Sequence, residues 1–256
     1  MTVDRQGRIW GLVAGEAASR GGRVSASDAC AAAVAAVQVT GGWLSAASSA
    51  EPAGHLMSVT DAVSERLAEL QLMLGEGPCP DAVADGGPVL ASDLGDTEAG
   101  RRWPVFAPAA RQAGAAAIFT FPLRIGAIGA GVMGLYRDRA GPLSDGQLGE
   151  ALIFADAAAL LLISAEQPGE TGAGTGPGGQ PADLAGHRAE IDQATGMLTE
   201  QLGVGITEAF IRLRAYAYAH DRPLADLARD IVARRLRLGP DRGPSEDGRR
   251  DGTPHP

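Results

Sequence analysis

The sequence predicts an α+β domain with a mostly antiparallel sheet, followed by a small all-α domain of three helices. Three observations lead to this fold class. Over residues 25–166 the order of patterns is helix, two strands, helix, strand, helix, two strands and a long helix. Residues 167–182 are rich in glycine and proline. Residues 183–238 carry three short amphipathic helical patterns.

The first domain opens with helical and strand-like segments. Residues 1–24 are polar and glycine-rich, and we expect them to be disordered or loosely ordered. An alanine run then predicts a helix with Ser25 or Ser27 as its N-cap. Residues 42–48 and 55–60 look like short strands joined by the turn EPAG. Thr60 is expected to cap the amphipathic helix that follows, which reaches about residue 74.

The rest of this domain completes the sheet. Residues 88–92 form a short strand, and residues 103–113 are expected to be helical. Residues 117–123 and 130–136 predict two further strands. Ser144 then caps a long helix to about residue 165, whose apolar positions nearly circle it, so it should pack on more than one side.

The segment GAGVMG, residues 129–134, has the G-x-G-x-x-G spacing of dinucleotide-binding loops. Such a loop needs a helix opening from its last glycines, because the helix N-terminus holds the pyrophosphate. Here Leu-Tyr-Arg-Asp-Arg-Ala-Gly-Pro follows, without helical periodicity. We therefore interpret the motif as the returning strand of a hairpin, with glycines at a bulge or a close backbone approach. No cofactor is predicted.

The second domain is bounded by segments that cannot bury enough surface to fold. These are a flexible linker at 167–182 and a disordered tail at 239–256. Between them, a first helix ends at Gly203. Thr207 is expected to cap a second, with Ile206 and Ile211 as a hydrophobic staple. Pro223 suits the first turn of the third helix.

Composition limits the function classes. All 22 basic residues are arginine and the net charge is −9, which argues against a cation-coated nucleic-acid binder but allows a local patch. Cys30 and Cys79 lack metal-site spacing and indicate a reducing compartment. We find no export signal and no stretch of membrane-spanning length. The expectation is a cytoplasmic protein that does not bind membranes.

The phrases LGEGPCPDAVADGGPVLASDL and RRWPVFAPAARQAGAAAIFTFPLRIG resemble the GAF domain, of the actinobacterial kind, within residues 25–166. The resemblance implies a sensory or dimerising module with a small-molecule pocket between the sheet and the loops over it. Its candidate ligand-binding residues here are Cys79, Trp103, Phe106 and Phe119. The aromatic residues serve equally as core. Cys79 at a helix start is either a redox-sensing thiolate or, more commonly, a small buried side chain.

Residues 189–236, AEIDQATGMLTEQLGVGITEAFIRLRAYAYAHDRPLADLARDIVARRL, resemble the ANTAR domain of transcription antiterminators. The match is carried by Ile191, Ala194, Gly196, Met197, Ala209, Leu213, Arg214, Leu227 and Ala228. It implies a homodimer that binds paired RNA hairpin loops in a leader transcript and prevents a terminator from forming. Thr195 stands where many members have lysine. Candidate RNA-binding residues are Thr195, Gly196, Arg212, Arg214 and Arg222, with arginine offering phosphate contacts and stacking.

No catalytic constellation is visible: the four histidines are scattered, and no nucleophile stands in a G-x-S-x-G turn. We therefore expect a sensor–effector regulator, controlled by a signal or a small-molecule effector, rather than an enzyme or a metal protein. Two other interpretations stay open. The last two helices also suit a DNA-binding helix-turn-helix. A protein–protein adaptor would follow if the RNA-binding surface has decayed.

Overall fold

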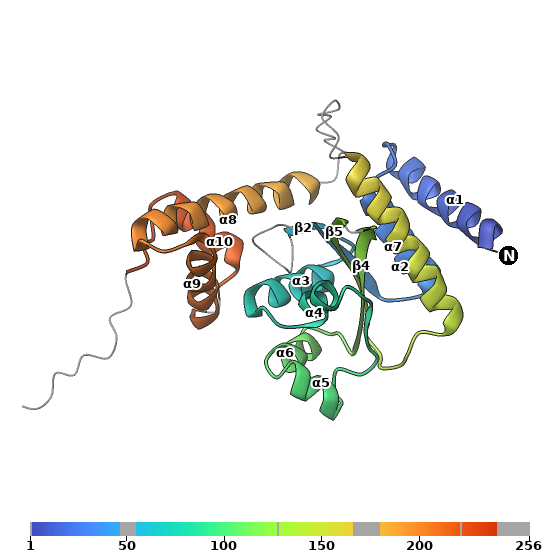
Figure 1. The fold of residues 1–256 in the computed structure, drawn as a ribbon, viewed down its shortest axis with the longest axis horizontal. Helices are drawn as coiled ribbons and strands as arrows, with labels where there is room; N and C mark the ends of the chain where they lie inside the picture. The colour runs from blue at the N-terminus through green and yellow to red at the C-terminus, as the bar shows by residue number, and fades with distance from the viewer. Residues whose placement is uncertain (1, 47–54, 127, 166–179, 221, 240–256) are drawn as a thin grey trace, which may run out of the picture.

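The computed structural model describes residues 2–46, 55–126, 128–165, 180–220 and 222–239. A five-stranded antiparallel sheet with helices on both faces is followed by a bundle of three helices, at the left of Figure 1. The fold class predicted from the sequence is therefore confirmed. The bundle consists of α8 (Gln180–Leu202), α9 (Ile206–Ala219) and α10 (Leu224–Val232).

The sheet has the strand order β2-β1-β5-β4-β3, and each neighbouring pair is antiparallel. The strands are β1 (Gly41–Ala46), β2 (His55–Val59), β3 (Val89–Ala91), β4 (Ala117–Ile125) and β5 (Ile128–Arg137). Both strands of the expected hairpin are present, and each is longer than the sequence pattern predicts because the pairing continues to the turn. The expected EPAG turn lies outside the described residues.

Alternate side chains of the strands enter two separate cores, one on each face of the sheet. Leu44, Phe119 and Leu135 pack against α2 (Ala26–Val37) and α7 (Asp145–Ala165). Their chain neighbours Trp43, Ile118 and Tyr136 face the opposite side. There the covering helices are α3 (Ala62–Leu74), α4 (Pro78–Asp85), α5 (Thr97–Arg102) and α6 (Phe106–Gln112).

Residues 1–24 are not loosely ordered as we expected, because Thr2–Arg20 form the helix α1. Ile9, Val13 and Ala17, spaced four residues apart, are buried, and the first two join the core beneath α2 and α7. Arg20 then binds Asp28 of α2 through two hydrogen bonds of 3.0 and 2.7 Å. This apolar stripe is narrow and lies among polar residues and glycine, so the composition of the segment concealed it.

The glycines of the G-x-G-x-x-G motif lie in β5, as the hairpin interpretation predicted. Gly134 of β5 pairs with Trp43 of the neighbouring strand β1, and a Cβ at Gly134 would lie 2.2 Å from the indole ring. Gly131 has a φ of +154°, and a Cβ there would lie 2.0 Å from the carbonyl oxygen of Ser45. Both positions therefore require glycine for close approach between strands.

Helix starts were predicted with mixed success. Ser25 caps α2 with Asp28 in a capping box, and Ser144 pairs reciprocally with Gln147 at the start of α7. Thr60 is not a cap: the neighbouring Asp61 accepts the hydrogen bond from the Ser64 amide and caps α3. Adjacent cap-forming residues are hard to distinguish by sequence, because only the backbone geometry selects one of them.

Two further expectations need correction. The helix expected over residues 103–113 is only α6, and α5 precedes it, with Trp103 ending that helix. The helix α7 is long and apolar enough to cross a bilayer by length and composition, with a mean hydropathy of 1.9. It is nevertheless a core helix, and it packs on more than one side as expected: Phe154, Ala158 and Leu162 are buried in the core against the sheet, and α7 also contacts α1 and α2. The expected linker and tail fall mainly on residues 166–179 and 240–256, outside the described residues.

Candidate nucleic-acid interface

The three-helix bundle closes around an apolar core of its own. Its buried side chains come from all three helices and include Ile191, Leu198, Leu213, Leu227 and Ile231. The helix α8 ends at Gly203, which has a φ of +65°. The next N-cap is Gly205 rather than Thr207, and Ile206 and Ile211 are each 55% exposed, so the expected hydrophobic staple does not form. Two isoleucines therefore face outward on α9.

Thr195 does not belong to the surface, contrary to our expectation. Its side chain is buried, and its hydroxyl donates a hydrogen bond of 2.7 Å to the carbonyl oxygen of Ile191. Gly196 is half-buried, and a Cβ at this position would meet no atom within 4 Å. Of the two, only Gly196 borders open space on α8.

Two of the predicted RNA-binding arginines form ion pairs within the bundle. Arg212 binds Glu208 one turn earlier on α9, at 2.7 Å. Arg222, before α10, binds Asp230 at 2.6 Å. Hydrogen bonds from Arg222 and Arg235 hold the pKa of Asp230 below its usual value. Both predicted arginines keep an exposed part, since their side chains are 30% and 39% accessible.

Arg214 reaches out of the bundle to the first domain. Its Nε donates a hydrogen bond of 2.8 Å to the carbonyl oxygen of Met73, near the end of α3. The guanidinium carbon lies 5.6 Å from the ring centroid of Phe210, one turn earlier on α9. The sequence pattern gave no sign of this contact, because Met73 lies 141 positions away along the chain.

The segment after α10 holds two cations that we did not select. Arg234 and Arg237 are exposed, and neither forms an ion pair with any residue that the structure describes. Arg234 also has a φ of +58°, which is uncommon for a residue with a side chain. Arginines at the end of a helix also compensate the helix dipole. Their signal in the sequence is the run Arg-Arg-Leu-Arg at residues 234–237.

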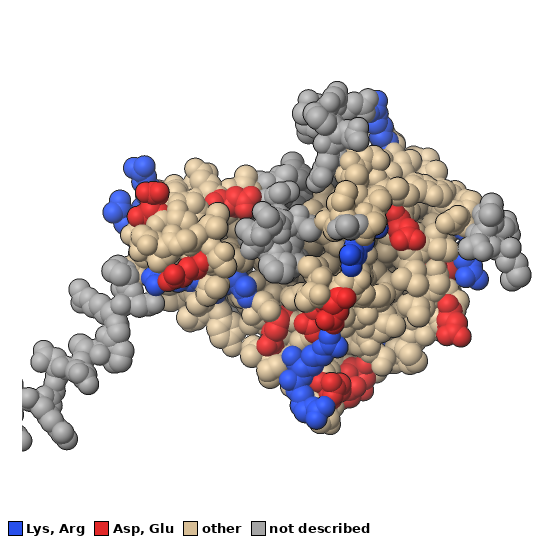
Figure 2. All heavy atoms as spheres, viewed as in Figure 1, with Lys and Arg blue, Asp and Glu red and all other residues tan. Residues whose placement is uncertain are grey.

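Charges of both signs lie side by side over the bundle on the face drawn in Figure 2. Near the end of α10, Arg229 and Arg235 are bound to acids, whereas Arg234 and Arg237 form no ion pair with the residues that the structure describes. The bundle therefore offers a few local cations rather than a broad basic surface. Affinity for phosphate depends on such local placement.

The predicted ligand-binding residues do not line one pocket. Cys79, Trp103 and Phe106 are buried in the core beneath α3 to α6, whereas Phe119 is buried on the opposite face of the sheet. Burial raises the pKa of Cys79 to about 12. The thiol is therefore neutral at physiological pH, so Cys79 lacks the thiolate that a redox-sensing cysteine requires.

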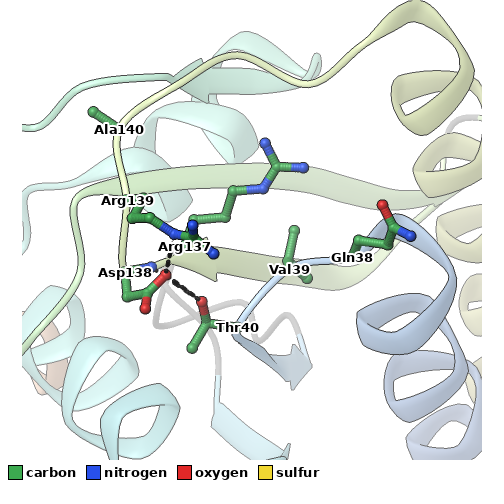
Figure 3. Close-up of a pocket in the computed structure, with 7 residues that line it drawn as sticks. All are labelled: Gln38, Val39, Thr40, Arg137, Asp138, Arg139 and Ala140. Atoms are coloured by element: carbon green, nitrogen blue, oxygen red, sulfur yellow. Dashed lines mark hydrogen bonds and ion pairs between the residues drawn. The ribbon is translucent and has the colours of Figure 1, made fainter.

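Two open pockets lie elsewhere on the first domain. One of about 450 Å³ follows α2 and β5 and is lined by Gln38, Val39, Thr40, Arg137, Asp138, Arg139 and Ala140 (Figure 3). Its Arg137 already donates hydrogen bonds to the carbonyl oxygens of Val37 and Pro142, so this cation supports the fold. The other pocket, of about 230 Å³, includes Trp103 beside Asp96 and Arg102.

Among the comparisons with known proteins, the match to a family model concerns the second domain. Residues 185–232 match the family model of the ANTAR domain. A search of the curated proteins found no match. Solved structures similar to the chain include the GAF domain of an Acinetobacter phosphoenolpyruvate-protein phosphotransferase, at 13% identity and a TM-score of 0.47, covering 64% of this chain and 93% of that one.

A second similar structure is a domain described as that of a two-component sensor histidine kinase protein from Sinorhizobium meliloti 1021. It has 19% identity and a TM-score of 0.41, and the alignment covers 53% of this chain and 86% of that one. Both TM-scores are low, so the assignment of the first domain rests on its own sequence and sheet.

Proposed function

We propose that this chain is a signal-responsive transcription regulator whose helical bundle binds paired RNA hairpins in nascent transcripts and causes antitermination. The match of residues 185–232 to the ANTAR domain carries this proposal. The closed bundle with exposed arginines supports it, because small helical modules can read unpaired loop bases while arginine contacts the phosphates. The protein acts as a homodimer, since two paired loops require two bundles.

The RNA contacts are expected at arginines around α9 and the end of α10. Arg234 and Arg237 are available without breaking an ion pair among the described residues. Arg212 and Arg222 keep accessible guanidinium groups beside their acids. Gly196 leaves space for the RNA backbone to approach α8. Thr195 contributes through packing, because its side chain is buried.

In this proposal the first domain is a GAF-like sensor and the protein works in the cytoplasm without catalysing a reaction. The resemblance of residues 25–166 to GAF domains supports the sensory role. Cys79, Phe106 and Phe119 are packed in the two cores, whereas Trp103 lines the smaller of the two pockets described above. The larger pocket, between Thr40 and Arg139 in Figure 3, is also of suitable size for an effector.

The DNA-binding alternative is less well supported by α10. A recognition helix presents base-reading side chains outward. Here Ala225 is buried, Asp226 faces solvent, and Arg229 is bound to Glu190 and Asp226. This surface would repel phosphate as much as attract it. The adaptor alternative predicts that the protein binds no nucleic acid. One titration with RNA and DNA therefore distinguishes it from the RNA-binding and DNA-binding functions.

A gel-shift titration tests the proposal with three probes and three proteins. The probes are an RNA with two tandem small-loop hairpins, an RNA with one hairpin, and matched duplex DNA, and the two-hairpin RNA is also titrated at raised salt. The proteins are the wild type, Arg234→Ala/Arg237→Ala, and Arg101→Ala. Arg101 is the matched control, because its side chain is 74% exposed on α5 of the first domain and lines neither pocket described above.

We expect selective binding of the two-hairpin RNA, weakened by the double substitution and unchanged by the control. Complexes of two protein chains per RNA would fit the dimer, and sedimentation of the free protein measures its mass. Equal binding of duplex DNA would favour the helix-turn-helix alternative. Binding of no nucleic acid by the wild type would favour the adaptor.

A further inference from the structure

The bundle touches the first domain in two places: α8 lies against β2, and α9 lies against the end of α3. Leu72 and Met73, at the end of α3, pack against the apolar core of the bundle. Among the residues that the structure describes, Leu72 is grouped with the core of the bundle and with neither core of the first domain. Beside it, Arg214 of α9 donates its hydrogen bond to the carbonyl oxygen of Met73. Figure 1 shows α9 next to the end of α3.

The end of α3 suits a cation in both charge and shape. The last carbonyl groups of a helix lack partners within the helix and carry partial negative charge. The last turn of α3 has no basic residue of its own, so Arg214 supplies the compensating charge. The helix is capped by Gly75 with a φ of +68°, and a Cβ there would lie 2.1 Å from an Arg214 nitrogen. The absence of a side chain at Gly75 leaves room for the guanidinium.

We propose that the end of α3 is a docking site for α9 that competes with RNA for Arg214. In this arrangement the sensor holds Arg214, one of the candidate RNA-binding arginines, and RNA binds fully only when α9 leaves α3. A signal in the first domain then acts by loosening this contact. The inference rests on the proposed RNA-binding function and adds a means of control to it.

The test measures binding of the two-hairpin RNA to the full-length protein by fluorescence anisotropy. Leu72→Gln removes the apolar half of the contact from the sensor side and adds no charge that could itself attract RNA. Leu161→Gln, a half-buried leucine of α7 packed on the opposite core, is the matched control for damage to the first domain. We expect Leu72→Gln to bind RNA about fivefold more tightly or better, and the control to change by less than about twofold.

A second pair of variants keeps the test decisive if a leucine substitution impairs folding. Gly75→Ala places a methyl group against Arg214. Gly86→Ala is its matched control, because Gly86 also ends a helix, at a φ of +67°, and a Cβ there would lie 2.3 Å from an Arg124 nitrogen. Both substitutions carry the same backbone cost, but only Gly75→Ala disturbs the contact between domains. We expect tighter RNA binding for Gly75→Ala alone.

Hydrogen exchange gives a readout that needs no substitution. If RNA and α3 compete for α9, adding RNA should speed exchange of the amides at residues 70–75. Slower exchange there would show that the contact persists in the complex and would overturn the competition. RNA affinities left unchanged by Leu72→Gln and Gly75→Ala would overturn it too, while leaving the proposed function standing. Failure of the wild type and both variants to bind RNA would overturn the proposed function, and the competition with it.

Discussion

The two cysteine side chains of the first domain are buried core residues rather than reactive groups. Cys30 and Cys79 are both buried, on opposite faces of the sheet, and burial raises the pKa of each thiol to about 12. Since only the thiolate reacts readily, neither side chain has the character of a redox sensor. Their role is that of small apolar residues in tight cores.

We predict that neither thiol reacts with a thiol-specific reagent at pH 8 in the folded protein, whereas both react within minutes after denaturation. Because the folded pKa lies above the ordinary value of 9.0, stability should also fall as the pH rises above 9, where the unfolded thiols ionise. Labelling rates followed by mass spectrometry measure the first effect. Rapid labelling of Cys79 in folded Cys30→Ala would contradict the prediction.

The strand β5 depends on its glycines at two places and tolerates substitution at a third. Gly134 lies against the indole of Trp43, whereas a Cβ at Gly129 would meet no atom within 4 Å. The two glycines belong to the same sequence motif and the same strand, so they form a matched pair. The sequence motif alone does not distinguish them.

We expect Gly134→Ala to lower the free energy of unfolding by about 1–3 kcal/mol, because the added methyl group forces Trp43 or the strand to shift. Gly129→Ala should change it by less than about 0.5 kcal/mol. Urea denaturation followed by tryptophan fluorescence measures both variants. A loss of similar size at the two positions would mean that β-propensity, rather than contact with Trp43, decides the effect.

The helix α1 belongs to the core of the first domain rather than to a tail. Ile9 is fully buried beneath α2 and α7, while Leu12, on the same helix, is 39% exposed. We expect Ile9→Ala to lower the free energy of unfolding by about 2 kcal/mol, at the low end for a buried isoleucine because a terminal helix can shift to fill the space. Leu12→Ala should cost less than half as much. Equal values, measured by urea denaturation, would indicate that α1 does not pack as described.

At the scale of the whole molecule, the negative net charge opposes RNA binding, whereas the position of a few arginines on the bundle favours it. The chain carries a net charge of −9, and the free cations of the bundle are few. Binding should therefore depend on a small number of phosphate contacts rather than on a broad field. Among the residues that the structure describes, Arg234 and Arg237 form no ion pair, so a dimer offers four such contacts while Arg214 stays docked on α3.

For those four contacts we predict that log K falls with log salt at a slope of roughly −3, taking about 0.7 per phosphate for a single strand. Arg234→Ala should reduce the slope by one to two and weaken binding to all RNA sequences alike. Anisotropy titrations between about 0.05 and 0.3 M salt measure the slope. A much steeper dependence would show that arginines now paired with acids, such as Arg212 and Arg222, release them on binding.

The sequence by itself determined the local features of this protein. Helix stripes such as Ile191 to Leu198, the hairpin of β4 and β5, and the caps Ser25 and Ser144 follow from periodicity and turn chemistry, which act over a few residues. The resemblance to ANTAR was likewise readable, because it rests on an unbroken phrase of sequence.

Only the tertiary structure decided which residues share a surface. Phe119 and Trp103 are both aromatic, yet Phe119 points from β4 into the core beneath α2 and α7, whereas Trp103, at the end of α5, lies in the core on the opposite face. Thr195 is buried where a surface residue was expected, and Arg214 contacts Met73 in the other domain. The physical reason is that burial and ion pairing depend on neighbours distant along the chain, which periodicity and capping do not encode.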